Sequence, residues 1–132
     1  MERLESIVMK VDRAAILAYA EITGDFNPIH VDPEFAAKTP MAGVIAHGTL
    51  SLNLIWQSLA ASFGTDALRG APLDIRFSRP VRDGDTVQAG GRLSEAELYD
   101  VWVRNQDGLN VIEGTARLKL AAKEQRNRPP SI

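Results

Sequence analysis

The stretch HGTLSLNLIWQSLAASF, residues 47–63, decides the fold of this chain. Leucine, isoleucine, tryptophan and phenylalanine occur nearly all round a helix drawn through it, and charged residues are few. A helix with apolar side chains on every side is typical of a protein interior. We therefore expect a long buried helix over residues 47–63.

After Gly64 the pattern changes to an alternation of apolar and polar residues, which predicts strands. The turn sequences RDGD (82–85) and QDG (106–108) separate some of these segments. The four segments are LDIRFSRPV (73–81), TVQAGGRLS (86–94), ELYDVWVRN (97–105) and LNVIEGTARLKLA (109–121). Four successive strands predict an antiparallel meander, curved around the helix in an α+β architecture.

The segment before the long helix contains shorter elements. LESIVMKV (4–11) is apolar, branched and partly alternating, which predicts a first strand. An amphipathic helix is expected over residues 13–23, with Asp12 as its N-cap and Gly24 as its stop. DPEFAAK (32–38) predicts one short helical turn opened by Asp32.

Composition limits the class of protein. The 132 residues fit one domain, expected over 1–122, with a disordered tail at 123–132. The 15 basic and 17 acidic side chains nearly balance, so no strong positive electrostatic field is available to attract nucleic acid or an anionic membrane.

No cysteine, signal peptide or membrane-length apolar run is present, so we expect a cytoplasmic protein. Exposed edge strands favour a homodimer.

The loop GDFNPIHVD (24–32) contains one of only two histidines. Taken singly, its residues have structural explanations: Gly24 ends a helix, Asn27 and Pro28 form a turn, and Asp25 caps it. Together, Asp25 and His30 lie five residues apart across a stiff turn that can direct both at one point. A carboxylate and an imidazole so placed are a common acid/base pair.

Two other chemistries are less well supported by the sequence. A metal could bind His30, Asp32 and His47, but a zinc site usually has three or four ligands with supporting partners. We therefore expect no metal. The GxSxG nucleophile motif and a glycine-rich phosphate loop are both missing.

GVIAHGTLS (43–51) lies where the long helix begins. The Gly48 amide falls in the first turn, where backbone donors lack intrahelical acceptors, so it can bind an anionic oxygen. The structural alternative is close packing of Gly48 against another backbone, with His47 as a cap or a core histidine.

YAEITGDFNPIHVDPEFAAKT (19–39) followed by GVIAHGTLS resembles the MaoC-like family of (R)-specific enoyl-thioester hydratases and dehydratases. IRFSRPVRDGDTV (75–87) is similar to a further, looser pattern of that family. The resemblance covers about a third of the chain, and it implies the hot-dog fold, a curved antiparallel sheet around a long central helix.

The resemblance also implies a mechanism. Asp25 and His30 would hold one water that adds to C3 of a trans-2-enoyl thioester, and the Gly48 amide would bind the enolate oxygen. No cofactor is needed, because coenzyme A is part of the substrate. Asn53 falls near a family position that fixes the catalytic loop, with a buried structural amide as the alternative. Asn27 is expected to form the turn.

The substrate is expected to be an acyl-CoA or acyl-carrier-protein thioester, whose binding residues the sequence leaves open. An acyl tunnel could involve aromatic residues that are more often core, namely Tyr19, Phe26, Trp56 and Phe63. Arginines that could meet substrate phosphate are Arg69, Arg76, Arg79 and Arg82. Two alternatives to the hydratase stay open: a hot-dog thioesterase, and one subunit of a heteromeric dehydratase.

Overall fold

The computed structural model describes residues 2–119, so the predicted tail at 123–132 lies outside the described residues. Strands and helices follow one another in an order close to the predicted one. They are β1 (Ile7–Val11), α1 (Arg13–Thr23), α2 (Pro28–Val31), α3 (Pro33–Ala37), α4 (Gly48–Phe63), the 3-10 helix η1 (Thr65–Leu68), β2 (Leu73–Phe77), β3 (Asp85–Glu95), β4 (Leu98–Arg104) and β5 (Asn110–Arg117).

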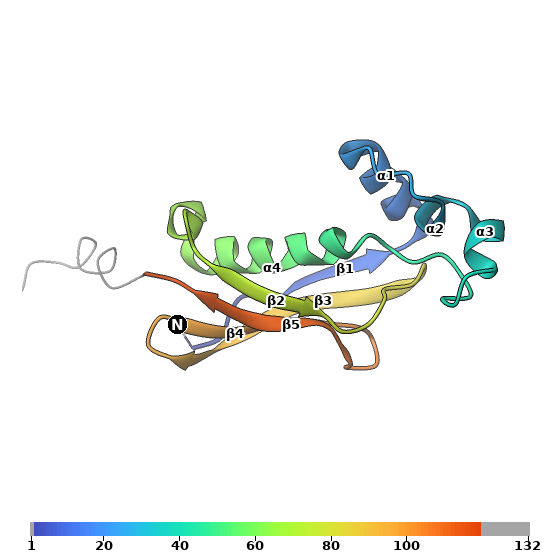
Figure 1. Ribbon diagram of the computed structural model, residues 1–132. Coiled ribbons are helices and arrows are strands. Elements are labelled where there is room, and N and C mark those ends of the chain that lie inside the picture. The colour runs from blue at the N-terminus through green and yellow to red at the C-terminus, as the bar shows by residue number, and fades with distance from the viewer. Residues whose placement is uncertain (1, 120–132) are drawn as a thin grey trace, which may run out of the picture.

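The five strands form one antiparallel sheet in the order β1-β3-β4-β5-β2, and α4 lies along one face of it (Figure 1). The predicted simple meander is wrong for β2, because this strand pairs with β5 at the edge instead of with β3. Both sides of β3 are already occupied by β1 and β4. The residues between β2 and β3 therefore cross from one edge of the sheet towards the other.

The core lies between α4 and the concave face of the sheet. Leu54, Ile55 and Leu59 of α4 are buried against strand residues such as Val103 and Ile112, which are direct neighbours in the β4–β5 register. The expectation that α4 is buried on all sides is wrong for the single chain. Its outward face is only half-buried or exposed, as at Leu52, Asn53, Trp56 and Gln57.

The three short helices gather at the end of the molecule where α4 begins (Figure 1). Asp12 caps α1 by accepting a hydrogen bond from the Ala15 amide, and Gly24 ends it at φ 72°, a left-handed conformation that favours glycine. Both predictions are confirmed. The loop that follows contains an additional helical turn, α2, with Asn27 as its cap and Pro28 at its first position.

No helix among residues 2–119 combines the length and the apolar character that crossing a lipid bilayer requires.

Candidate active site

The structure brings Asp25 and His30 together. The Asp25 Oδ2 atom lies 4.0 Å from His30 Nε2, a gap too long for a direct hydrogen bond. The Asp25 side chain is 52% exposed, whereas the His30 side chain is 12% exposed. A reactant can therefore approach the carboxylate from solvent while the imidazole is held in the protein.

The loop between α1 and α2 sets the direction of the Asp25 side chain. Its Oδ1 atom accepts a hydrogen bond from the Asn27 amide at 3.2 Å, which leaves Oδ2 turned towards His30. Asn27 in turn accepts a hydrogen bond from the Ile29 amide at 3.1 Å. Asn27 is thus placed as a helix cap and turn former, as the sequence predicts.

A backbone carbonyl fixes the tautomer of His30. Its Nδ1 atom lies 2.8 Å from the Ile45 carbonyl oxygen, and because a carbonyl can only accept, Nδ1 must carry the hydrogen. When the ring is neutral, Nε2 presents its lone pair towards Asp25. The dyad therefore consists of two hydrogen-bond acceptors that face one point.

His47, which the sequence offered only as a cap or core histidine or as a metal ligand, is the N-cap residue of α4 and is 3% exposed. Its ring stacks on the His30 ring, with centroids 3.9 Å apart and planes 26° apart. Its Nε2 atom lies 2.9 Å from the Asp25 carbonyl oxygen. The signal available in the sequence was its place directly before Gly48 in a chain with only two histidines.

Gly48 is the first residue of α4, and its amide has no hydrogen-bond acceptor among residues 2–119. A pocket of about 360 Å³ adjoins it, lined by His47, Ser51, Phe77, Arg79 and further residues of β5 and the segment after β2. His47 lines this pocket, and its ring also stacks on the ring of His30. The predicted oxyanion donor therefore lies beside the predicted acid/base pair.

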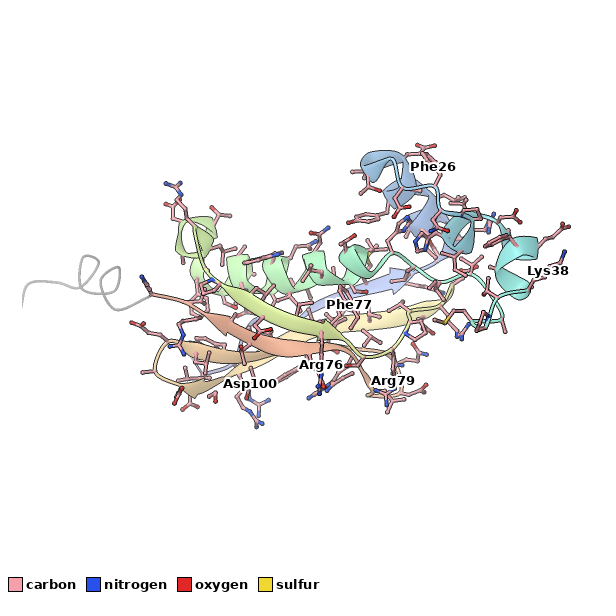
Figure 2. The ribbon with its side chains drawn as sticks, viewed as in Figure 1. Phe26, Lys38, Arg76, Phe77, Arg79 and Asp100 are labelled. Carbon is pink, nitrogen blue, oxygen red and sulfur yellow. The ribbon has the colours of Figure 1, made fainter. Side chains whose placement is uncertain are left out.

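Phe77 covers the start of α4 closely. A Cβ atom added to Gly48 would lie 2.8 Å from Phe77 Cε1, so only glycine fits without a shift of that ring. Figure 2 shows Phe77 on the side of β2 that faces α4. The ring is 55% exposed, which leaves it free to turn. The close neighbour of Gly48 is therefore a side chain and not the backbone that the packing alternative expected, and this contact is compatible with the amide-donor interpretation.

Asn53 does not contact the catalytic loop. Its Nδ2 atom donates to the Tyr19 hydroxyl at 3.3 Å, and that hydroxyl donates to Thr49 Oγ1 at 2.7 Å. The Asn53 side chain is exposed rather than buried, so the alternative of a buried amide is wrong as well. Asn53 ties α4 to α1, which leads into the catalytic loop.

The four arginines considered for substrate phosphate lie in different parts of the structure. Arg76 projects from the sheet face opposite α4 (Figure 2), where it bonds Glu113. Arg69 pairs with Asp66 at 3.8 Å. Of the four, only Arg79 lines the pocket beside Gly48. Of the aromatic residues considered for a tunnel, Phe63 packs on Tyr99 at the far end of α4, and Phe26, which follows Asp25, is 55% exposed.

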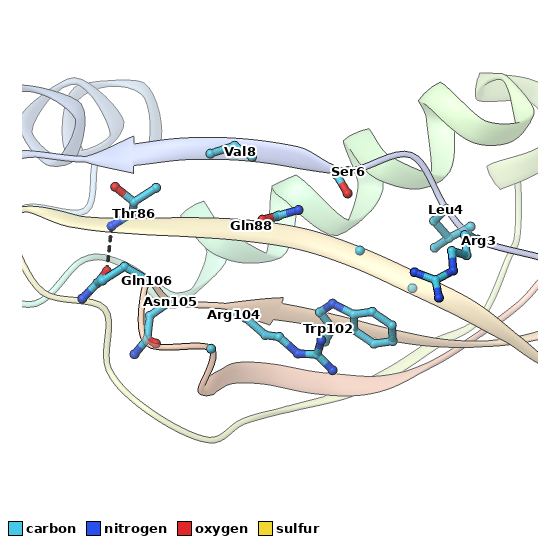
Figure 3. Close-up of a pocket in the computed structure, with 13 residues that line it drawn as sticks. Arg3, Leu4, Ser6, Val8, Thr86, Gln88, Trp102, Arg104, Asn105 and Gln106 are labelled. Carbon is cyan, nitrogen blue, oxygen red and sulfur yellow. Dashed lines mark hydrogen bonds between the residues drawn. The ribbon is translucent and has the colours of Figure 1, made fainter.

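A second pocket, of about 450 Å³, lies on the outer face of the sheet (Figure 3). Trp102 and Arg104 of β4 line it together with Gln88 of β3 and residues at the N-terminus. The alternation along β3 and β4 places these side chains on the face opposite the core. The whole sheet thus separates this pocket from Asp25 and His30.

A metal-type cluster is present, though with a different carboxylate from the one considered in the sequence. Asp25, His30 and His47 each offer a ligand atom within 4.8 Å of the others, while Asp32 accepts hydrogen bonds at the start of α3. Imidazoles bind metal in the plane of the ring, at about 2.1 Å. An ion in the plane of one of two rings that stack with centroids 3.9 Å apart and planes 26° apart lies out of the plane of the other, so the two rings are poorly arranged to share it. The geometry fits a hydrogen-bonding dyad better than a metal centre.

Comparison with known proteins agrees with this geometry. The MaoC-like domain model matches residues 1–115. The 3-hydroxybutyryl-CoA dehydratase of Methylorubrum extorquens is 31% identical over 128 residues, covering 92% of this chain and 80% of that protein. The unliganded R-hydratase PhaJ1 from Pseudomonas aeruginosa superposes with a TM-score of 0.76 at 27% identity, covering 89% of this chain and 78% of that one.

The (R)-hydratase from A. caviae involved in PHA biosynthesis superposes with a TM-score of 0.73 at 28% identity, covering 90% of this chain and 96% of that one. The five-stranded antiparallel sheet with its central helix and these structural neighbours confirm the predicted hot-dog fold. The names of the relatives agree with the expected lyase-type enzyme. The chain belongs to the MaoC-like domain family.

Proposed function

We propose that this protein hydrates trans-2-enoyl-CoA to (R)-3-hydroxyacyl-CoA, or catalyses the reverse dehydration, with Asp25 and His30 activating one water. The observation that carries this proposal is the 4.0 Å gap between Asp25 Oδ2 and His30 Nε2. A water about 2.8 Å from each atom bridges such a gap. Both atoms accept hydrogen bonds, so the water would direct its hydrogens at the dyad and a lone pair at the substrate.

The reaction then follows from this orientation. Asp25 takes a proton from the water as its oxygen bonds C3, and the C2–C3 π electrons move towards the thioester oxygen to form an enolate. A proton then returns to C2 on the same face, so that one water has been added in total. The residue that returns the proton to C2 is either Asp25 or His30.

The Gly48 amide supports this step electrostatically. Negative charge develops on the thioester oxygen only as the enolate forms, and a donor placed for that charge stabilises the transition state more than the ground state. The pocket of about 360 Å³ beside Gly48 is large enough for part of a thioester substrate. Arg79, which lines it, is the pocket residue suited to a phosphate group.

A homodimer is part of the proposal. No strand among residues 2–119 pairs with the outer edge of β2, and Phe77 on this strand is 55% exposed next to Gly48. The outward face of α4 is also uncovered, with Trp56 only half-buried. A second copy that extends the sheet beyond β2 would cover both features.

The test measures loss of the conjugated enoyl absorbance of a short trans-2-enoyl-CoA together with release of free thiol. We expect absorbance loss without thiol. Thiol release at the same rate would instead identify the thioesterase alternative. Asp25→Asn and His30→Ala should each slow turnover by about 10²- to 10⁴-fold. Asp32→Asn, which keeps an N-cap in the same loop, is the matched control and should leave turnover unchanged.

The carrier of the acyl group needs a separate comparison. The same enoyl group presented on coenzyme A and on an acyl-carrier protein gives two values of kcat/KM, and we expect the coenzyme A value to be the larger. No turnover of either substrate by the purified chain would point to a heteromeric enzyme that requires another subunit.

A further inference from the structure

His47 contacts both members of the dyad and is the residue directly before the candidate oxyanion donor. It hydrogen-bonds the Asp25 carbonyl, stacks on the His30 ring, and occupies the N-cap position of α4 without a side-chain capping hydrogen bond. We propose that His47 is a positioning residue that sets the carboxylate, the imidazole and the amide relative to one another. This inference rests on the proposed function and assigns His47 no contact with the reacting atoms.

The hydrogen bond to Asp25 is the first part of the argument. Asp25 lies in the exposed loop between α1 and α2, and its own amide has only a long bond, 3.3 Å, to Thr23 Oγ1. The 2.9 Å bond from His47 Nε2 to the Asp25 carbonyl is therefore the shorter of the two backbone anchors at this residue. The donor of this bond, His47, stands directly before α4, and one face of α4 is buried in the core.

The ring stack is the second part. The His30 ring is fixed at one edge by the Ile45 carbonyl, and the His47 ring lies flat against one of its faces. Tyr19 of α1 approaches the His47 ring edge-on, with centroids 5.1 Å apart and planes 64° apart. A ring held in this way keeps His30 Nε2 directed at Asp25.

The buried Nδ1 atom of His47 indicates that the imidazole is kept for more than packing. Because Nε2 must carry the hydrogen donated to a carbonyl, Nδ1 is an acceptor, and it has no partner among residues 2–119. Burying an unsatisfied polar atom destabilises a fold, so an apolar side chain would pack at lower cost. The hydrogen bond to Asp25 explains why a histidine stands there.

Two substitutions separate the hydrogen bond from the ring. His47→Phe keeps a flat ring against His30 and removes the donor, whereas His47→Gln keeps an amide donor that reaches about as far as Nε2. We expect His47→Phe to lower kcat about 10- to 100-fold with KM unchanged, because small misplacements of catalytic groups cost that much. His47→Gln should recover most of the loss.

The outcomes are distinguishable from failure of the proposed function, which would appear as an inactive wild-type protein. Wild-type turnover by His47→Phe, an effect on KM alone, or a His47→Gln variant as slow as His47→Phe would each overturn the inference. Melting curves of both variants show whether a loss of kcat comes from a folded enzyme.

Nitrogen NMR of the wild-type protein provides a readout that does not depend on turnover. The chain has only two histidines, so one His30→Gln sample assigns both rings. We expect His47 as the pure Nε2–H tautomer and His30 as the Nδ1–H tautomer. A mixture of tautomers at His47 would mean that the bond to the Asp25 carbonyl is absent, and the inference would fail.

Discussion

Replacement of Gly48 by proline removes one backbone amide hydrogen and adds a side-chain ring. Proline is favoured at the first position of a helix, which Gly48 occupies in α4. The residue before a proline must be extended, and His47 already has φ −59° and ψ 133°. The Gly48 amide has no acceptor among residues 2–119, so no internal hydrogen bond is lost.

The expected loss of activity follows from the role proposed for the amide. Removal of one oxyanion donor typically costs about 10²- to 10³-fold in kcat, or about 3–4 kcal/mol of transition-state stabilisation. Proline also adds a Cβ atom, which would lie 2.8 Å from Phe77 Cε1. Because Gly48→Ala adds the same atom and keeps the amide hydrogen, it is the matched control for displacement of Phe77.

The assay compares kcat of Gly48→Pro with kcat of Gly48→Ala on the same enoyl-CoA, after melting curves have shown that both variants are folded. We expect the alanine variant to retain most of its activity and the proline variant to fall by the full factor. If a folded proline variant turns over as fast as the alanine variant, the Gly48 amide does not bind the enolate oxygen, and that part of the mechanism is wrong.

Three further perturbations test other parts of the structure. Dialysis against a chelator should leave turnover unchanged, and recovery of a lost rate by added zinc would contradict the geometric argument against a metal. Tyr19→Phe removes the hydroxyl that bonds Thr49 and Asn53, and it should lower the free energy of unfolding by about 0.5–1 kcal/mol in denaturant titrations. The hydrogen bond from Arg76 holds the pKa of Glu113 below its ordinary value of 4.5, so this pair stabilises the fold above that pH and stops doing so as pH falls through the lowered pKa. Glu113→Gln should therefore be less stable than the wild type at neutral pH, with the difference vanishing in acid; a difference that grows in acid would reverse the sign of this argument.

The local signals in the sequence predicted the elements well. Asp12, Gly24 and Asp32 act as caps and stops where the sequence placed them, because capping depends on neighbours a few residues away. The place of β2 could not be predicted in this way. Alternation shows which side chains share a face, but the choice of β5 as the neighbour of β2 depends on which strands are already paired.

The site shows the same division between local and long-range information. Asp25 and His30 are five residues apart, so a stiff turn alone suggests that they meet. The contact of His47 with Asp25 joins residues 22 positions apart, and nothing in the spacing of AHG indicates it. Asn53 was expected at the catalytic loop and lies instead against Tyr19, since its place on α4 directs it towards α1.

Activity should be more fragile than the fold, because different contacts support them. The sheet and α4 are joined by a continuous buried core that includes Leu54, Val103 and Ile112. The dyad lies at the edge of that core, where the neighbouring Ile29 is only partly buried against it and His47 contacts the Asp25 carbonyl and the His30 ring. Segments with few buried contacts open at lower free energy than the core. Mild denaturant should therefore abolish turnover before the sheet unfolds, with the loss of dyad geometry as the cause.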